Sequence, residues 1–141
     1  MNNTLTILIA DSNKFISEFL RAELTKYTEF KIVDIALTVN EEIEMIDKYK
    51  PNVVITNIKK DGKISGLDII ETYKKRAYST EFVIISGYDK LYYSSTLLEL
   101  DVTYYIQKPF SYDTIIDALL EIQGARYESM EWTKCQWYCL L

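Results

Sequence analysis

The chain has 141 residues, of which 48% are hydrophobic and 26% are charged, and its formal net charge is −5. This length and composition predict one globular domain with a single core. Proteins that bind DNA or RNA need a basic face to displace counterions, and no Lys/Arg cluster supplies one here. The composition therefore argues against direct nucleic-acid binding by this domain.

Other protein classes are also disfavoured. No apolar stretch approaches the roughly 18 residues that a membrane span needs, and the first four residues carry no cationic signal region. The chain has no histidine, the commonest general base and transition-metal ligand. Cys135 and Cys139 are its two cysteines and resemble no disulfide framework. We expect a cytoplasmic protein without a structural metal.

Short apolar runs alternate with longer periodic segments along the chain. Runs of four to six residues, apolar on both faces, are typical of buried parallel strands. They cover residues 5–10, 31–35, 53–56, 82–86 and 103–107. The segments between them have helical spacing, and the first carries an apolar stripe made of Phe15, Ile16, Phe19, Leu20 and Leu24.

Capping residues mark where the helices begin. Thr38 and Glu41 stand in capping-box relation, Ser65 is placed to cap a helix over 67–76, and Ser111 opens the last helix. Five strands, each followed by a helix, predict an α/β fold of (βα)5 type. Right-handed crossovers make it a doubly wound, five-stranded parallel sheet with helices on both faces.

The composition changes at Gly124. We therefore predict a domain over residues 1–123 and an aromatic-rich C-terminal tail over residues 124–141. In doubly wound sheets, ligands bind beyond the carboxyl ends of the strands. Polar residues stand at or just after four of these ends: Asp11, Asn57, Ser86 and Lys108.

Four segments in order, within about residues 4–123, resemble the receiver domain of two-component response regulators, which has a flavodoxin-like fold. Residues 7–13 resemble its first strand and acidic end, with Asp11 and Ser12. Residues 51–58 resemble its third strand, with Asn57 at the phosphoacceptor position. Residues 82–88 and 105–110 resemble the last two strands, with Ser86 and Tyr105 as switch-type residues, Lys108, and Pro109 as the candidate for a cis peptide bond.

The resemblance implies a known chemistry. In the family, an aspartate accepts a phosphoryl group, and two acidic residues after the first strand hold Mg²⁺. The lysine pairs with the phosphoryl oxygens. The Ser/Thr hydroxyl moves toward the phosphate, and the aromatic residue on the fifth strand rotates inward.

This chain departs from the pattern at the phosphorylation site itself. The Asn57 carboxamide is neutral and its oxygen is a poor nucleophile. Ser12 replaces the second acidic residue, which leaves Asp11 as a remnant of the acidic metal pocket. Because the charges of Asp11 and Lys108 cancel, we expect Mg²⁺ binding to be weak or absent, and no other cofactor.

The loop after Asn57 departs as well. The family has a Met-Pro pair there and a glycine eight residues beyond the acceptor. This chain has Lys59 and Lys60 in the loop, and Gly66 stands nine residues beyond Asn57. Asp61, in the same loop, is a minor candidate for a substitute carboxylate.

Plainer interpretations remain open. Asp11 is either a relic that pairs with Lys108 or a residual ligand-binding group, and Lys108 is also a candidate hydrogen-bond donor to Asn57. Ser86 and Tyr105 either keep the residue types of the family switch without its movement, or still move when a partner binds. An engineered Asn57 is a further alternative, against which Ser12 and the altered loop argue.

Aromatic residues supply the candidates for an interface. Tyrosine is enriched in protein interfaces, although single exposed aromatics are common. The candidates near the fourth helix, fifth strand and fifth helix, the family's usual partner face, are Tyr92, Tyr93, Tyr104 and Tyr112, and those in the tail are Trp132 and Trp137. A frayed tail is the alternative for the last two.

The leading hypothesis is a non-enzymatic pseudo-receiver that regulates by binding a protein partner or a second copy, independently of phosphorylation, without touching nucleic acid or membrane. A second hypothesis is the receiver part of a DNA-binding transcriptional regulator whose output domain is absent from this chain. A third is a live phosphoryl acceptor that uses Asp61 or Asp11.

Overall fold

A five-stranded parallel sheet forms the centre of the computed structural model. The structure describes residues 4–60, 65–76 and 79–139, and for 127–139 it describes the backbone alone. The strands pair in the order β2-β1-β3-β4-β5, which confirms the predicted (βα)5 fold. The strands are β1 (Leu5–Ala10), β2 (Phe30–Ala36), β3 (Val53–Thr56), β4 (Glu81–Ser86) and β5 (Tyr104–Gln107). The helices are α1 (Lys14–Leu24), α2 (Val39–Tyr49), α3 (Gly66–Lys75), the 3₁₀ turn η1 (Lys90–Tyr93), α4 (Ser94–Glu99) and α5 (Tyr112–Cys139).

Two hydrophobic cores lie on opposite faces of the sheet. On one face, side chains of α1 and α5 such as Leu20 and Leu119 pack against β1 residues including Ile7. On the other, side chains of α2, α3 and α4, such as Ile46, pack against Leu8. Alternate residues of each central strand therefore enter different cores, which is why the strands are apolar on both faces.

The predicted stripe of α1 is only partly buried. Leu20 and Leu24 face the core, whereas Phe15 is 75% exposed and Phe19 47%. Ser17 takes the buried position one turn before Leu20, and its hydroxyl donates a hydrogen bond of 2.9 Å to the Asp11 carbonyl. The apolar stripe is therefore wider than the buried face of α1, and both phenylalanines lie outside that face.

The expected caps form, with one difference. Ser65 and Asp68 make a reciprocal capping box at the start of α3. At the start of α2, the Thr38 hydroxyl accepts a hydrogen bond from the backbone N–H of Glu41, but the Glu41 carboxylate accepts from Leu37 N–H, one residue before the expected partner.

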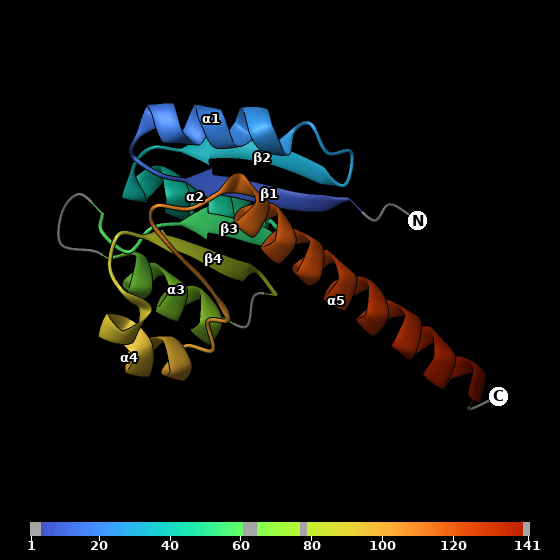
Figure 1. Cartoon of the computed structure of the whole chain (residues 1–141). Helices are drawn as coiled ribbons and strands as arrows, with labels where there is room; N and C mark the ends of the chain where they lie inside the picture. The colour runs from blue at the N-terminus through green and yellow to red at the C-terminus, as the bar shows by residue number, and fades with distance from the viewer. Residues whose placement is uncertain (1–3, 61–64, 77–78, 140–141) are drawn as a thin grey trace.

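Helix α5 continues without a break through Gly124, across the predicted boundary between domain and tail. Its C-terminal half extends away from the sheet (Figure 1). Among the residues that the structure describes, no helix is long and apolar enough to span a membrane.

Gly66 lies against the backbone of the strand end that carries Asn57. A Cβ atom added at Gly66 would stand 2.0 Å from the Asn57 carbonyl oxygen, closer than any real contact. The Gly66 N–H also donates to the Ile58 carbonyl at 2.7 Å, so this close approach is part of the turn. Only glycine fits here without moving α3 away from the site.

We expect Gly66→Ala to lower the free energy of unfolding by about 1–3 kcal/mol, because the added methyl group forces the backbone apart. Gly124→Ala is the matched control. It has open space around its Cβ position and should raise helix stability by up to about 1 kcal/mol. Urea denaturation of both variants measures the difference, and equal effects would contradict the close packing.

Candidate functional site

The parallel register brings the predicted polar residues to one edge of the sheet. Ala10 pairs with Thr56 across β1 and β3, and Ser86 pairs with Gln107 across β4 and β5. Asp11, Asn57 and Lys108 follow directly in the chain. The carboxyl end of the sheet is therefore the candidate site, as the sequence predicted.

Asp11 is buried and Ser12 is exposed at this edge. One Asp11 carboxylate oxygen accepts a hydrogen bond of 2.9 Å from the backbone N–H of Asn13, which in turn caps α1. Asp11 is thus engaged in holding the turn between β1 and α1. Ser12 adds no charge to the site.

Asn57 and Lys108 do not form the contacts expected of them. The Asn57 side-chain oxygen is buried and has no hydrogen-bond partner within the described part of the chain. Lys108 makes no ion pair with Asp11 among the described residues. Both predicted contacts of Lys108 are therefore wrong. Its backbone N–H donates to the Ser86 carbonyl at 2.7 Å, and the Lys108–Pro109 bond is cis, as predicted.

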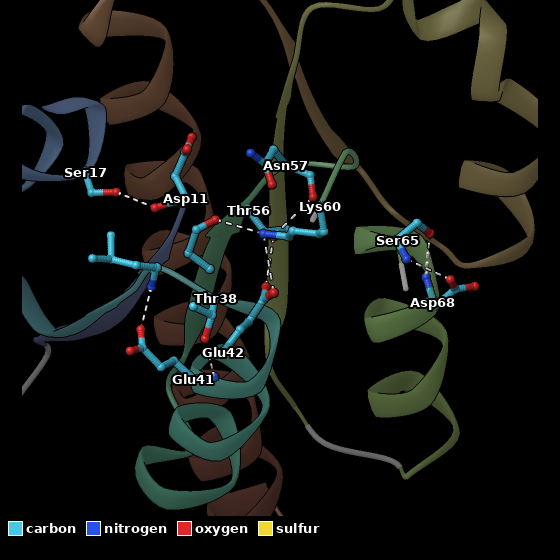
Figure 2. A network of polar contacts seen from close by, with 12 residues as sticks. Asp11, Ser17, Thr38, Glu41, Glu42, Thr56, Asn57, Lys60, Ser65 and Asp68 are labelled. Atoms are coloured by element: carbon cyan, nitrogen blue, oxygen red, sulfur yellow. Dashed lines mark hydrogen bonds and ion pairs between the residues drawn. The ribbon is translucent and has the colours of Figure 1, made fainter. Parts of the chain in front are cut away.

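The cation that enters the site is Lys60, from the loop after β3. Its ammonium nitrogen lies 3.4 Å from a carboxylate oxygen of Glu42 and donates to the Ala10 carbonyl at 3.0 Å. The other Glu42 oxygen accepts a hydrogen bond of 2.9 Å from the Thr56 hydroxyl. Figure 2 shows the Lys60 side chain reaching toward Glu42 in the region of Asp11 and Asn57. Exposure of the Lys60 and Glu42 side chains is 7% and 1%.

Burial changes the acid–base properties of this pair. Loss of water raises the pKa of the Glu42 carboxyl, and the nearby Lys60 charge and the Thr56 hydroxyl partly offset this. Loss of water also lowers the pKa of the Lys60 amine, against the opposing influence of Glu42 and of Asp11. In both cases desolvation outweighs the attraction between the charges.

Glu42 is a site residue that the sequence prediction missed, although one signal for it was present. Glu42 lies four residues before Ile46, which is fully buried, so both occupy the same face of α2. A charged residue on the buried face of a helix needs a partner. That partner, Lys60, was noted in the sequence only as a departure from the family pattern in the loop after Asn57.

Comparison with known proteins identifies the family. The family model named response regulator receiver domain matches residues 7–120. The chain belongs to the response regulator receiver family. This receiver is 28% identical, over 82% of its length, to an uncharacterized transcriptional regulatory protein, YesN, of Bacillus subtilis. It is also 28% identical, over 89% of its length, to the acid tolerance regulatory protein ActR of Rhizobium meliloti.

The receiver spans 32% of YesN and 62% of ActR, so both relatives are considerably longer than this chain. Among solved structures, the isolated receiver domain of RcsB from Salmonella enterica serovar Typhimurium superposes with a TM-score of 0.78. At 20% identity, over 86% of this chain and 89% of that one, this likeness shows the fold alone.

The residues of this receiver do not fit the Mg²⁺ ion of the family. Asp11 is the single carboxylate that remains of the family's three, and the Lys60 ammonium, held by Glu42 and Ala10, interacts with it electrostatically. Within the described ranges, no group of three or more His, Cys, Asp or Glu side chains could hold a metal. Asp61 lies outside the described residues.

The two switch-type residues of the receiver converge on Tyr88. The Ser86 hydroxyl accepts a hydrogen bond of 3.1 Å from the Tyr88 N–H, and the Tyr105 hydroxyl donates to the Tyr88 carbonyl at 2.7 Å. Both residues therefore hold the segment between β4 and η1, just beyond the site.

The predicted interface tyrosines fall into different environments. Tyr92 and Tyr93 form a ring cluster with Tyr88, and Tyr92 is 74% exposed. Tyr104 and Tyr112 are half-buried against the α1–α5 core, and Tyr112 stacks on Phe19. The backbones of Trp132 and Trp137 belong to α5, but their side chains lie outside the described residues.

We expect Lys60→Met to lower the free energy of unfolding by about 3 kcal/mol, because the Glu42 carboxylate is then buried without a counter-charge. The double variant Glu42→Leu/Lys60→Met should lie within about 1 kcal/mol of wild type, since an apolar pair needs no desolvation of charge. Urea denaturation gives both values. Lys59→Met, at the exposed neighbouring position, is the control, and an equal effect of Lys59→Met and Lys60→Met would show that the pair does not form.

The raised pKa of Glu42 also predicts a pH dependence. The folded protein holds the Glu42 proton more tightly than the unfolded chain, whose pKa is near 4.5. This stabilising contribution is present below about pH 4.5 and disappears as the pH rises through the raised pKa of the folded state. Wild type should therefore lose stability relative to Glu42→Leu/Lys60→Met as the pH rises above about 4.5, because the carboxyl loses its proton more readily in the unfolded chain. Parallel urea titrations test this, and identical pH profiles would contradict it.

Proposed function

We propose that this receiver is a non-enzymatic, phosphorylation-independent regulatory module that acts by binding a protein. The observation that carries the proposal is the chemistry at the tip of β3. A neutral amide stands at the acceptor position, and the nearest buried cation, Lys60, is already paired with Glu42. Position 57 therefore offers no carboxylate nucleophile, and the described residues offer no acidic cluster for Mg²⁺.

The charge of the site supports the same proposal. Asp11 and Lys108 cancel, and Glu42 and Lys60 add one negative and one positive charge. These four described residues therefore sum to zero charge without any ligand. A divalent ion would bring two uncompensated positive charges into a partly buried site, at a large desolvation cost.

Incubation with Mg²⁺ and a small phosphodonor, followed by intact mass measurement, tests the proposal. We expect no mass increase, because the Asn57 amide oxygen does not attack phosphorus. A receiver with an acceptor aspartate, treated in parallel, shows that the donor is active. A stable gain of one phosphoryl group would overturn the proposal, and peptide mapping would then decide between Asp11 and Asp61.

The exposed apolar side chains of η1 and α4 are the proposed partner surface. Leu91 is 80% exposed, Tyr92 74% and Leu98 83%, and Tyr92 belongs to the ring cluster around Tyr88. The cluster adjoins the segment that Ser86 and Tyr105 hold, so binding there is coupled to the sheet edge. A shift of the switch residues requires only that the partner binds one of their arrangements more tightly.

Pull-down from extracts of the native cell tests this surface. We expect the double variant Leu91→Ser/Leu98→Ser to lose proteins that wild type retains, because the apolar contact area is removed. Leu120→Ser is the matched control, since Leu120 is a partly exposed leucine on α5. If Leu120→Ser alone lost the same proteins, the partner surface would be assigned to α5 instead of η1 and α4.

A second candidate function is the receiver part of a DNA-binding transcriptional regulator. It is favoured by the relatives, several of which are named as transcriptional regulatory proteins and are longer than this chain. The reading frame beyond Leu141 decides. A following basic helical domain supports this candidate, and a stop codon directly after Leu141 excludes it.

A further inference from the structure

The surroundings of the Lys60 ammonium are those of a bound cation. It contacts a carboxylate oxygen of Glu42 and a backbone carbonyl, that of Ala10, which are the kinds of oxygen that hard metal ions bind. The Thr56 hydroxyl fixes the other Glu42 oxygen. The buried Asn57 side-chain oxygen, without a hydrogen-bond partner among the described residues, belongs to the same sheet edge.

We propose that Lys60 is a resident cation of this sheet edge: a tethered ammonium, held by oxygen atoms of Glu42 and Ala10, that supplies a fixed positive charge where the family elsewhere recruits a divalent ion. The proposal goes beyond phosphorylation independence, because it states what fills the pocket and which residue binds it. Glu42, from α2, is the specific cation ligand and is not one of the three acidic positions of the family.

The burial of Glu42 favours such a cation. Glu42 is 1% exposed, and a buried carboxylate without a counter-charge is very unfavourable. A free metal ion would have to lose its water and its translational freedom, and its occupancy would depend on its concentration. A lysine side chain is present at a fixed stoichiometry, so the pocket is filled under all ionic conditions.

The tether also has a mechanical consequence. Lys60 joins the loop after β3 to the end of β1 through Ala10 and to α2 through Glu42. The loop is thereby held on the sheet edge without metal or phosphate. Removal of the ammonium should both free the loop and leave an oxygen-lined site with net negative charge.

A Mn²⁺ titration followed by calorimetry or by water proton relaxation tests the proposal. Wild type should show no saturable binding at millimolar Mn²⁺. Lys60→Met should bind at least about tenfold more tightly, because the pocket gains a negative charge and loses its occupant. Lys60→Gln is the second variant. The glutamine amide keeps a hydrogen-bond donor for the Ala10 carbonyl, so this variant should lose less folding stability than Lys60→Met.

Matched controls assign the ligand. Glu42→Gln/Lys60→Met should lose the gained affinity, whereas Glu44→Gln/Lys60→Met, changed at an exposed glutamate of the same helix, should keep it. Lys59→Met should behave as wild type. The proposal is overturned if Lys60→Met and Lys60→Gln bind Mn²⁺ no better than Lys59→Met, or if the Glu42 and Glu44 changes act alike.

A measurement on the wild-type chain tests the proposal even if a variant fails to fold. Limited acetylation with peptide mapping should modify Lys60 at least about tenfold more slowly than exposed Lys59, because the ammonium is buried and paired. Equal rates would overturn the tethered-cation proposal and leave the proposed function standing. Phosphorylation of wild type would overturn the function, while slow acetylation of Lys60 would still support the tether.

Discussion

The rest of the site depends on one buried ion pair, between Glu42 of α2 and Lys60 of the loop after β3. Neither charge is stable alone in this place, so each is kept there by the other. Two further oxygens, from Ala10 and Thr56, complete the arrangement. The pair therefore links α2, β1, β3 and the loop after β3 at the sheet edge.

The Glu42–Lys60 pair offers one common explanation for the departures from the receiver pattern at Asn57 and Ser12. In the proposed arrangement, an aspartate at position 57 would lack the metal ion that assists phosphoryl transfer in the family. The neutral Asn57 and the exposed Ser12 are consistent with a pocket whose charge is already balanced. Asp11 remains because it holds the turn before α1, through Asn13, whatever the pocket contains.

Much of the fold could be predicted from local pattern, and the centre of the site could not. Strands such as β1 and β3 are apolar on both faces, which is typical of a parallel sheet covered on both sides. The polar residues at the strand ends followed from the topology. The Glu42–Lys60 contact joins residues far apart in sequence, and its geometry depends on how α2 packs on the sheet. Phe15 and Phe19 were misplaced for a related reason: helical spacing shows which residues share a face, but not how far the core extends around the helix.

The length of α5 has a consequence for how the sheet edge communicates. The helix packs against the sheet through residues such as Ile115, Leu119 and Ile122, then continues to Cys139. At about 1.5 Å per residue, the part after Ile122 adds about 25 Å of stiff rod. A small tilt at its base, where Tyr112 stacks on Phe19, therefore becomes a displacement of several ångströms at its far end. The described backbone of α5 would therefore amplify, at its far end, any tilt imposed where the helix packs on the sheet.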